Sequence, residues 1–157
     1  MTYVASVITV STRANAGIYQ DTAGPAAVDF LRELGFDVAP LRCIPDGEGV
    51  AGAVRDAASC SSLVLTCGGT GISPSDVTPE QTQLVIDREV PGIADFIRAN
   101  SWDVVPTAAL SRGIVGTVGQ ALIINLPGSR RAVLQCLTVL EPILAHALDQ
   151  LNGGDHG

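Results

Sequence analysis

The chain has 157 residues, 46% of them apolar, which is enough for one domain with its own core and excludes a disordered chain. Its net charge is −7 at pH 7, and all nine residues of the Lys and Arg classes are arginine. A general nucleic-acid binder carries a basic face, which this composition does not supply, so we expect no nucleic-acid partner. Any anion site must therefore consist of backbone amides and a few arginines.

Aromatic residues make up only 4% of the chain, so the core must consist of Val, Ile, Leu and Ala, a mixture that suits a parallel sheet flanked by helices. The N-terminus lacks a basic region and a cleavage site, and no apolar run reaches membrane length, so we expect a cytoplasmic protein without a membrane partner. The cysteines show no C-x-x-C spacing, and we interpret them as small buried hydrophobes in a reducing compartment: Cys43, Cys60, Cys67 and Cys136.

Residues 3–10 predict a buried first strand, which a polar loop up to residue 21 follows. Ligands of doubly wound sheets bind outside the carboxyl ends of the strands, which makes Ser11 and Arg13 candidate ligand contacts. An ordinary strand-to-helix loop with a surface arginine is the alternative. Apolar spacing then predicts a helix over 24–34 that ends at Gly35.

Residues 36–44 predict a second strand, in which Pro40 indicates a sheet edge or a bulge. Asp46 follows the carboxyl end of that strand, ahead of a helix predicted over 49–60. An aspartate before a glycine is a common turn residue, and a carboxylate at a strand end is also a ligand for Mg²⁺. The sequence leaves both interpretations of Asp46 open.

The stretch 63–71 joins an apolar, β-branched strand, residues 63–67, to the loop Gly68-Gly69-Thr70-Gly71. These glycines can take positive φ and admit a ligand to the bare backbone, while successive amides in such a turn form a nest for anions. The Thr70 hydroxyl adds a donor at the same place. The pattern predicts either a phosphate-binding loop or only a tight strand-to-helix turn.

A helix start follows this loop. Thr78 is a candidate N-cap, Pro79 suits the first helical position and Gln81 completes a capping-box spacing, which together predict a helix over 79–88. A carboxylate beside a phosphate nest repels the phosphate unless a cation lies between them. We therefore interpret Asp76, together with Asp46, as a pair that holds Mg²⁺, with a capping acid at the helix N-terminus as the alternative for Asp76.

The C-terminal half begins with a helix predicted near 92–100, and Trp102 then serves packing or a subunit contact. Two apolar strands, 114–118 and 121–126, flank a two-residue turn and predict a hairpin, which places an antiparallel strand on the sheet. The turn Pro127-Gly128-Ser129 either holds a second anionic group or caps the next helix through Ser129.

The last segment, residues 130–151, is apolar on most faces, and we expect Pro142 to split it into two helices. An all-round apolar helix needs cover on both sides, so we expect part of it to meet another subunit. We interpret His146 as a packed helical histidine and residues 152–157 as a flexible tail. No linker or repeat is visible, which predicts a single domain over 1–151.

These segments resemble the molybdopterin adenylyltransferase family (Mog/MoaB, the molybdenum cofactor biosynthesis fold) nearly end to end. The specific block is Gly68-Gly69-Thr70-Gly71 followed by Asp76-Val77-Thr78-Pro79-Glu80. The other matching pieces are individually weak and fall in the right order: Ser11-Thr12-Arg13, residues 17–21, Pro45-Asp46, Pro106-Thr107, Ser111-Arg112 and Leu126-Pro127-Gly128.

The resemblance implies an α/β fold, a three-layer α/β/α sandwich with a mostly parallel, doubly wound sheet, assembled as a homotrimer. It implies Mg²⁺-dependent transfer of AMP from ATP to the terminal phosphate of molybdopterin, release of pyrophosphate, and hand-over of the product to a molybdate-inserting protein. The family's two important acids fall on Asp46 and Asp76. Its pterin and phosphate contacts map to the glycine loop, to Ser111-Arg112 and to Pro127-Gly128-Ser129.

Two positions depart from the family pattern. Thr12 stands where an aspartate is common, and Ser75 stands where an arginine often precedes the motif aspartate. The missing arginine motivates a second hypothesis, a MoaB-like molybdopterin-binding protein with little or no adenylyltransferase activity. A third hypothesis, an interaction module on the same fold, assigns no role to the two acids.

Overall fold

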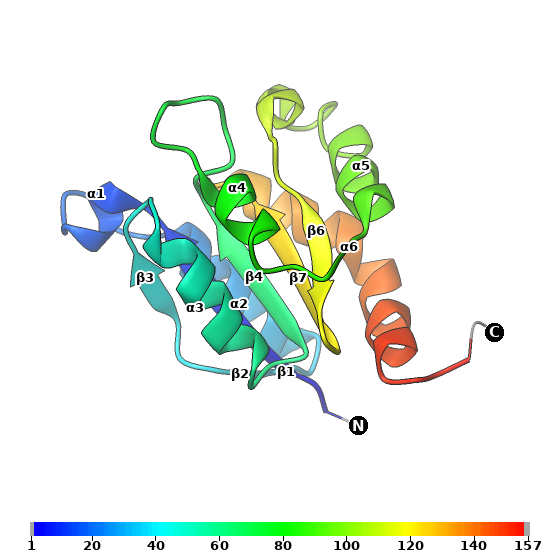
Figure 1. The fold of residues 1–157 in the computed structure, drawn as a ribbon. Coiled ribbons are helices and arrows are strands. Elements are labelled where there is room, and N and C mark those ends of the chain that lie inside the picture. The colour runs from blue at the N-terminus through cyan, green and yellow to red at the C-terminus, as the bar shows by residue number, and fades with distance from the viewer. Residues whose placement is uncertain (1, 156–157) are drawn as a thin grey trace.

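The computed structural model describes residues 2–155 as a seven-stranded sheet with helices on both faces (Figure 1). The strands are β1 (Val4–Val10), β2 (Asp37–Val38), β3 (Arg42–Ile44), β4 (Leu63–Cys67), β5 (Arg88–Glu89), β6 (Val115–Val118) and β7 (Ala121–Leu126). The helices are α1 (Thr12–Asn15), α2 (Ala23–Glu33), α3 (Gly49–Ala58), α4 (Thr78–Gln83), α5 (Pro91–Ala99) and α6 (Arg130–Leu151), with the 3₁₀ turn η1 (Pro106–Leu110).

The sheet has the order β2-β1-β4-β7-β6-β5, and β3 also pairs with β1. Strands β1 to β4 and β7 pair in parallel, whereas β6 runs antiparallel to both β7 and β5, which confirms the mostly parallel sheet and its antiparallel hairpin strand. The chain moves from β1 to β2 and β3 on one side and returns to β4 on the other. The loops after β1 and β4 therefore meet at a switch point, where open α/β sheets bind ligands.

Alternate residues of the central strands belong to two separate cores, which explains the layers. Val7 and Leu65 pack in the cluster that includes side chains of α2, α5 and α6. Ile8 follows Val7 and Val64 precedes Leu65, and both pack in the cluster that includes α3. Because side chains alternate across a sheet, buried apolar residues at successive positions require helices on both faces. The three-layer α/β/α sandwich is thereby confirmed.

Several short elements differ from the predictions. The strand expected over 36–44 is two short strands, β2 and β3, which flank Pro40 and pair with β1 at the sheet edge, as the proline indicated. The loop after the first strand contains the four-residue helix α1. Neither the two-residue strand β5 nor η1 was predicted, because elements of this length are too short for hydrophobic periodicity to show.

The start of α4 differs from the predicted capping box. Val77 occupies the N-cap, while Thr78 and Pro79 are the first helical residues, and the helix ends at Gln83 rather than at residue 88. The Thr78 side chain is fully buried beside Gly69, and within residues 2–155 its hydroxyl forms no hydrogen bond. The Gln81 Oε1 accepts a hydrogen bond from the amide of Ala51 at 3.3 Å instead of completing the box.

Helix α6 runs unbroken through Pro142, so the predicted split is wrong. Pro142 lies on the exposed side, where the carbonyl that loses its helical donor faces solvent, while Leu140 and Leu144 hold both halves to the core. Among residues 2–155, α6 alone is long and apolar enough to cross a membrane by length and composition, which a search for an unbroken apolar run missed. A core helix passes the same test.

The cysteine prediction holds for two of the four positions. Burial raises the pKa of the Cys67 thiol and raises that of Cys136 to about 11, so both stay neutral inside the core. The prediction is wrong for Cys60, which is exposed, and Cys43 is only partly buried.

The end of α6 also differs from expectation. His146 is exposed and contacts Gln150 at 2.8 Å, so it is not the packed histidine that we predicted. The amides of Asn152 to Gly154 bond to carbonyls of the last helical turn. The remainder of the predicted tail falls partly outside the described residues, and its flexibility stays a prediction.

Candidate functional site

The glycine loop lies at the carboxyl end of β4, and its glycines are needed for two different reasons. Gly68 and Gly69 have φ of +112° and +67°, the left-handed region that favours glycine. A Cβ at Gly68 would also clash with the carbonyl oxygen of Val10, since the loop crosses directly over the end of β1. Gly71 does not take positive φ, contrary to expectation; there, a Cβ would lie only 2.8 Å from Asp76 Oδ2.

Asp46 is fixed at this edge through one oxygen and faces the glycine loop with the other. Its Oδ2 accepts hydrogen bonds from the backbone amide and the hydroxyl of Thr12, both at 3.0 Å. Its amide donates back to the Thr12 hydroxyl at 3.1 Å. A Cβ added at Gly69 would lie 2.8 Å from Asp46 Oδ1. Asp46 is therefore more than a turn residue, because its second oxygen points at the loop.

Asp76 also contacts the glycine loop, from the other end of the segment 71–76. Its Oδ2 accepts a hydrogen bond from the amide of Ser73 at 3.1 Å, and its own amide donates to the Ser73 carbonyl at 2.9 Å. The carboxylate therefore closes a local turn instead of capping α4. Since Asp46 faces Gly69 and Asp76 faces Gly71, the structure brings the two predicted acids to the same four-residue loop.

Two pockets, one lined by Asp46 and the other by Gly71, contain most of the other predicted site residues. A pocket of about 640 Å³ is lined by Ser11, Thr12, Arg13, Tyr19, Asp46 and Ser75. A second pocket of about 280 Å³ includes Thr70, Gly71, Ser111, Pro127, Gly128 and Ser129. Ser129 is also the N-cap of α6 and accepts a hydrogen bond from the Ala132 amide, so both of its predicted roles are compatible.

Two charged side chains line the first pocket, those of Arg13 and Asp46. The Arg13 guanidinium lies 5.8 Å from the centroid of the Tyr19 ring, and within residues 2–155 it forms no ion pair. The Tyr19 hydroxyl in turn contacts Ser11 Oγ at 3.0 Å. This arrangement leaves Arg13 free to contact an anionic ligand, while Ser11 also caps α1 through the Ala14 amide.

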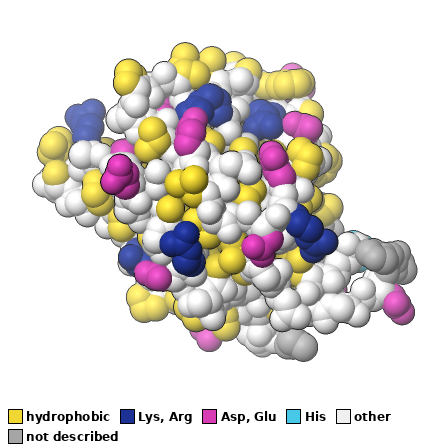
Figure 2. Space-filling view, in the orientation of Figure 1, with side chains coloured by type: hydrophobic (Ala, Val, Ile, Leu, Met, Phe, Trp, Pro, Cys, Tyr) yellow, Lys and Arg dark blue, Asp and Glu magenta, His cyan; other side chains and the backbone are white. Residues whose placement is uncertain are grey.

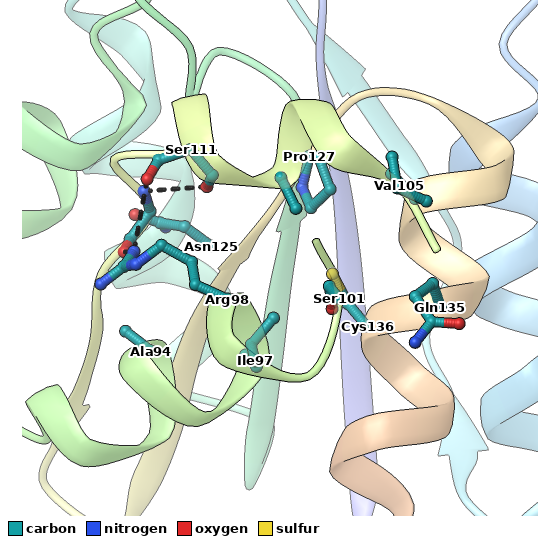
Figure 3. Close-up of a pocket in the computed structure, with 13 residues that line it drawn as sticks. Ala94, Ile97, Arg98, Ser101, Val105, Ser111, Asn125, Pro127, Gln135 and Cys136 are labelled. Atoms are coloured by element: carbon teal, nitrogen blue, oxygen red, sulfur yellow. Dashed lines mark hydrogen bonds between the residues drawn. The ribbon is translucent and has the colours of Figure 1, made fainter. Parts of the chain in front are cut away.

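Arg112, predicted as a ligand contact, directs its side chain at the protein itself. Its Nε donates to the Gly71 carbonyl and its Nη2 to the Asp76 carbonyl, both at 2.8 Å. Its Nη1 forms an ion pair with Glu80, and this hydrogen bond holds the pKa of the Glu80 carboxyl below its ordinary value. Ser111 accepts from the Gly113 amide at 3.2 Å, as Figure 3 shows.

Sequence reasoning missed Arg98, which supports the segment that carries Ser111. Its guanidinium donates to the Gly113 carbonyl at 2.8 Å (Figure 3). It also forms an ion pair with Asp95 at 3.1 Å. Arg98, Ser101, Ser111, Asn125 and Cys136 contribute to the lining of a small, mainly apolar cavity behind the second pocket. Arg98 sits on α5 among apolar residues, and only its spacing from Asp95, one helical turn, was a visible signal.

A buried polar network under the loop was also missed. Asn125 donates to the hydroxyls of Thr66 and Thr82 at 2.9 and 3.0 Å, and it accepts from the Ile114 amide at 3.2 Å. The Thr82 hydroxyl in turn donates a hydrogen bond to the Thr78 carbonyl at 2.8 Å. The network thus joins β4, β7 and α4 directly beneath the glycine loop. A polar residue in the otherwise apolar strand at 121–126 was the available signal.

Replacing Asn125 by leucine should lower the free energy of unfolding by about 3 kcal/mol, since the change leaves the Ile114 amide without its acceptor and removes the donor to the Thr66 and Thr82 hydroxyls. Urea unfolding followed by circular dichroism measures this. Asn100→Leu is the matched control, because Asn100 is exposed and its side-chain amide donates to the Phe96 carbonyl of its own helix. Equal stability of the two variants would contradict a structural role for the network.

The charged side chains do not form a single basic surface on the face that Figure 2 shows. Arginines stand apart from one another, with acidic side chains interspersed among them. An anion site on this protein therefore depends on local backbone donors and single arginines.

Sequence and structure comparisons relate the chain to proteins of molybdopterin and molybdenum cofactor biosynthesis. A family described as a probable molybdopterin binding domain matches residues 6–146. A molybdopterin adenylyltransferase of Helicobacter pylori is 35% identical over 155 residues, covering 94% of this chain and 86% of the relative. A molybdenum cofactor biosynthesis bifunctional protein of Synechococcus elongatus is 37% identical over 98% of this chain. The match covers 49% of that relative, so this chain spans about half of the relative's length. The structure of a molybdopterin biosynthesis Mog protein from Mycobacterium ulcerans superposes with a TM-score of 0.88 at 45% identity, covering 98% and 99% of the two chains.

Proposed function

The chain belongs to the Mog/MoaB family of molybdopterin-binding domains, and on this premise we propose that it is a molybdopterin adenylyltransferase of molybdenum cofactor biosynthesis. The reaction transfers AMP from ATP to the terminal phosphate of molybdopterin and releases pyrophosphate. The observation that carries the proposal is the placement of Asp46 and Asp76 against the same glycine loop, with one pocket lined by Asp46 and a second lined by Gly71.

The two acids fit a magnesium ion held jointly with the substrates. Magnesium is commonly bound through one or two carboxylates together with substrate phosphates and water, rather than by a cage of protein ligands. The described residues contain no group of three or more His, Cys, Asp or Glu that would form such a cage. We propose that Asp46 and Asp76 hold Mg²⁺, which when bound neutralises charge on the reacting phosphates.

The protein's own contribution is positioning. Backbone amides of the glycine loop orient a phosphate, while Arg13 contacts an anionic group in the first pocket. The second pocket, with Ser111 and the Pro127-Gly128-Ser129 turn, receives the other substrate. No side-chain nucleophile is needed, because the terminal phosphate of molybdopterin itself attacks the α-phosphate of ATP and pyrophosphate leaves.

The alternative, a molybdopterin-binding protein with little activity, is not favoured. Its motivation was Ser75 in place of an arginine, and Ser75 lines the first pocket beside Arg13, which supplies a cation there. Both acids also keep their contacts with the glycine loop. These observations support an enzyme over a binding protein.

The assembly and cellular setting belong to the same proposal. We propose a cytoplasmic homotrimer that passes its product to a molybdate-inserting protein. Exposed apolar side chains on α5, on η1 and on the segment that joins them support a subunit contact there: Phe96, Trp102, Val104 and Leu110. Sedimentation equilibrium of the purified protein measures the oligomeric state, and a monomer would contradict this part of the proposal.

The proposed activity is tested with purified protein, ATP, MgCl₂ and molybdopterin. We expect adenylylated molybdopterin and pyrophosphate in equal amounts, and neither product when EDTA replaces Mg²⁺ or when molybdopterin is omitted. Binding of molybdopterin without either product would support the binding-protein alternative instead.

A further inference from the structure

We propose that Arg112, paired with Glu80, is a positioning residue that staples the loop 71–76 and so holds the Asp76 carboxylate against the glycine loop. The expected effect on kcat rests on the proposed function. The expected effect on the loop rests on the hydrogen bonds of Arg112 alone. It differs from the sequence-based expectation, which took Arg112 as a direct contact of the substrate.

The contacts of Arg112 join both ends of the loop. The guanidinium donates to the carbonyls of Gly71 and Asp76, each at 2.8 Å, and the Arg112 amide donates to the Thr70 carbonyl at 2.8 Å. The residues that begin and end the loop are therefore held to one side chain. If that side chain were lost, Gly71 and Asp76 would no longer share a partner, and the nearest remaining link would be the bond from the Thr78 amide to the Gly69 carbonyl at 3.1 Å, outside the loop.

Few other contacts restrain this loop. Residues 72–75 are all exposed, and Ile72 is 72% exposed despite being apolar. Within the loop, the reciprocal bonds between Ser73 and Asp76 close only a local turn. A segment with no buried side chain opens easily unless hydrogen bonds from outside hold it. Arg112 supplies those bonds.

Glu80 fixes the direction of the guanidinium. It lies in the first turn of α4 and forms an ion pair with Nη1, so the arginine is held between the loop and the helix. A planar guanidinium can donate to two carbonyls and a carboxylate at once, whereas the single ammonium of lysine cannot reproduce that geometry. The staple therefore requires arginine in particular, not only a positive charge.

The variants Arg112→Lys, Arg112→Met and Glu80→Gln test this, with Arg32→Met as control, because Arg32 forms an exposed ion pair on α2, away from the loop. The first measurement is hydrogen exchange of peptides covering residues 71–77 in the free protein. The second is kcat for adenylyl transfer and the Kd for molybdopterin. Urea unfolding checks that each variant is folded, and Glu80→Gln keeps the test available if an Arg112 variant does not fold.

We expect exchange in 71–77 to accelerate about 10-fold or more in both Arg112 variants and less in Glu80→Gln, with no change in Arg32→Met. We expect kcat to fall about 10- to 100-fold in both Arg112 variants, while the Kd for molybdopterin stays within about 3-fold. Unchanged exchange would overturn the staple. So would an Arg112→Lys variant that keeps its turnover while Arg112→Met mainly loses molybdopterin affinity, which is the pattern of a direct charge contact.

The two proposals fail in different ways. A wild-type protein without adenylyl transfer would contradict the proposed function, yet hydrogen exchange would still decide whether Arg112 holds the loop. Normal wild-type turnover with unchanged loop exchange in the variants would contradict the staple alone.

Discussion

Replacing Asp46 or Asp76 by asparagine should lower kcat for adenylyl transfer by about 10²-fold or more, because each change removes a negative charge from the position proposed for Mg²⁺. The asparagine side chain is nearly the same size and keeps one carbonyl oxygen. It can therefore still accept the hydrogen bonds from Thr12 or Ser73 that fix each acid in place. We therefore expect both variants to fold normally and to lose kcat for adenylyl transfer.

The measurement is the initial rate of pyrophosphate release at saturating ATP and molybdopterin, over a range of Mg²⁺ concentrations. Asp29→Asn serves as control, since Asp29 is exposed on α2 and its carboxylate forms an ion pair with Arg32 at 4.0 Å, away from the glycine loop. We expect the control to match the wild type and the two site variants to need more Mg²⁺ for any residual rate. Turnover within about 3-fold of wild type in both site variants would favour the interaction-module hypothesis, which gives the acids no role.

The central part of the site could be predicted from sequence because short segments of chain determine it. An apolar strand that ends in Gly68-Gly69 fixes a sharp turn, and the positive φ of both residues was expected from their type. The rule that ligands bind at the carboxyl ends of strands then placed Asp46 near the same turn, although it lies on a different loop. The local sequence pattern and the sheet topology therefore both place Asp46 and the glycine loop at the same edge of the sheet.

The remaining features depend on packing that sequence spacing does not encode. Arg112 contacts a carbonyl 41 residues away, and nothing at position 112 shows that a protein carbonyl occupies its guanidinium. Thr78 has the residue type of an N-cap, but close packing against Gly69 overrides that preference. Pro142 should break a helix, and contacts of Leu140 and Leu144 with the core maintain it. For Thr78 and Pro142, tertiary contacts outweigh a local propensity of about 1–3 kcal/mol.

Replacing Gly69 by alanine should reduce turnover by about 10²-fold and lower the free energy of unfolding, because two penalties coincide at this position. The first is the left-handed conformation, with φ of +67°, which costs an alanine about 1–2 kcal/mol. The second is close approach, since the new Cβ would clash with the Thr78 hydroxyl and lie 2.8 Å from Asp46 Oδ1. Moving the Asp46 carboxylate by even about 1 Å is enough to cost 10²-fold in rate.

Gly119→Ala separates the two penalties. Gly119 has a similar φ of +57°, lies in the β6–β7 turn, and has no heavy atom within 4 Å of an added Cβ, so this variant carries the conformational penalty alone. Urea unfolding should therefore show Gly69→Ala to be less stable than Gly119→Ala by about 1–3 kcal/mol, the usual cost of overpacking. Only Gly69→Ala should lose turnover. If the two variants had equal stability and equal rates, the close contact of the glycine loop with Asp46 would have no functional consequence, and the loop would be only a turn between a strand and a helix.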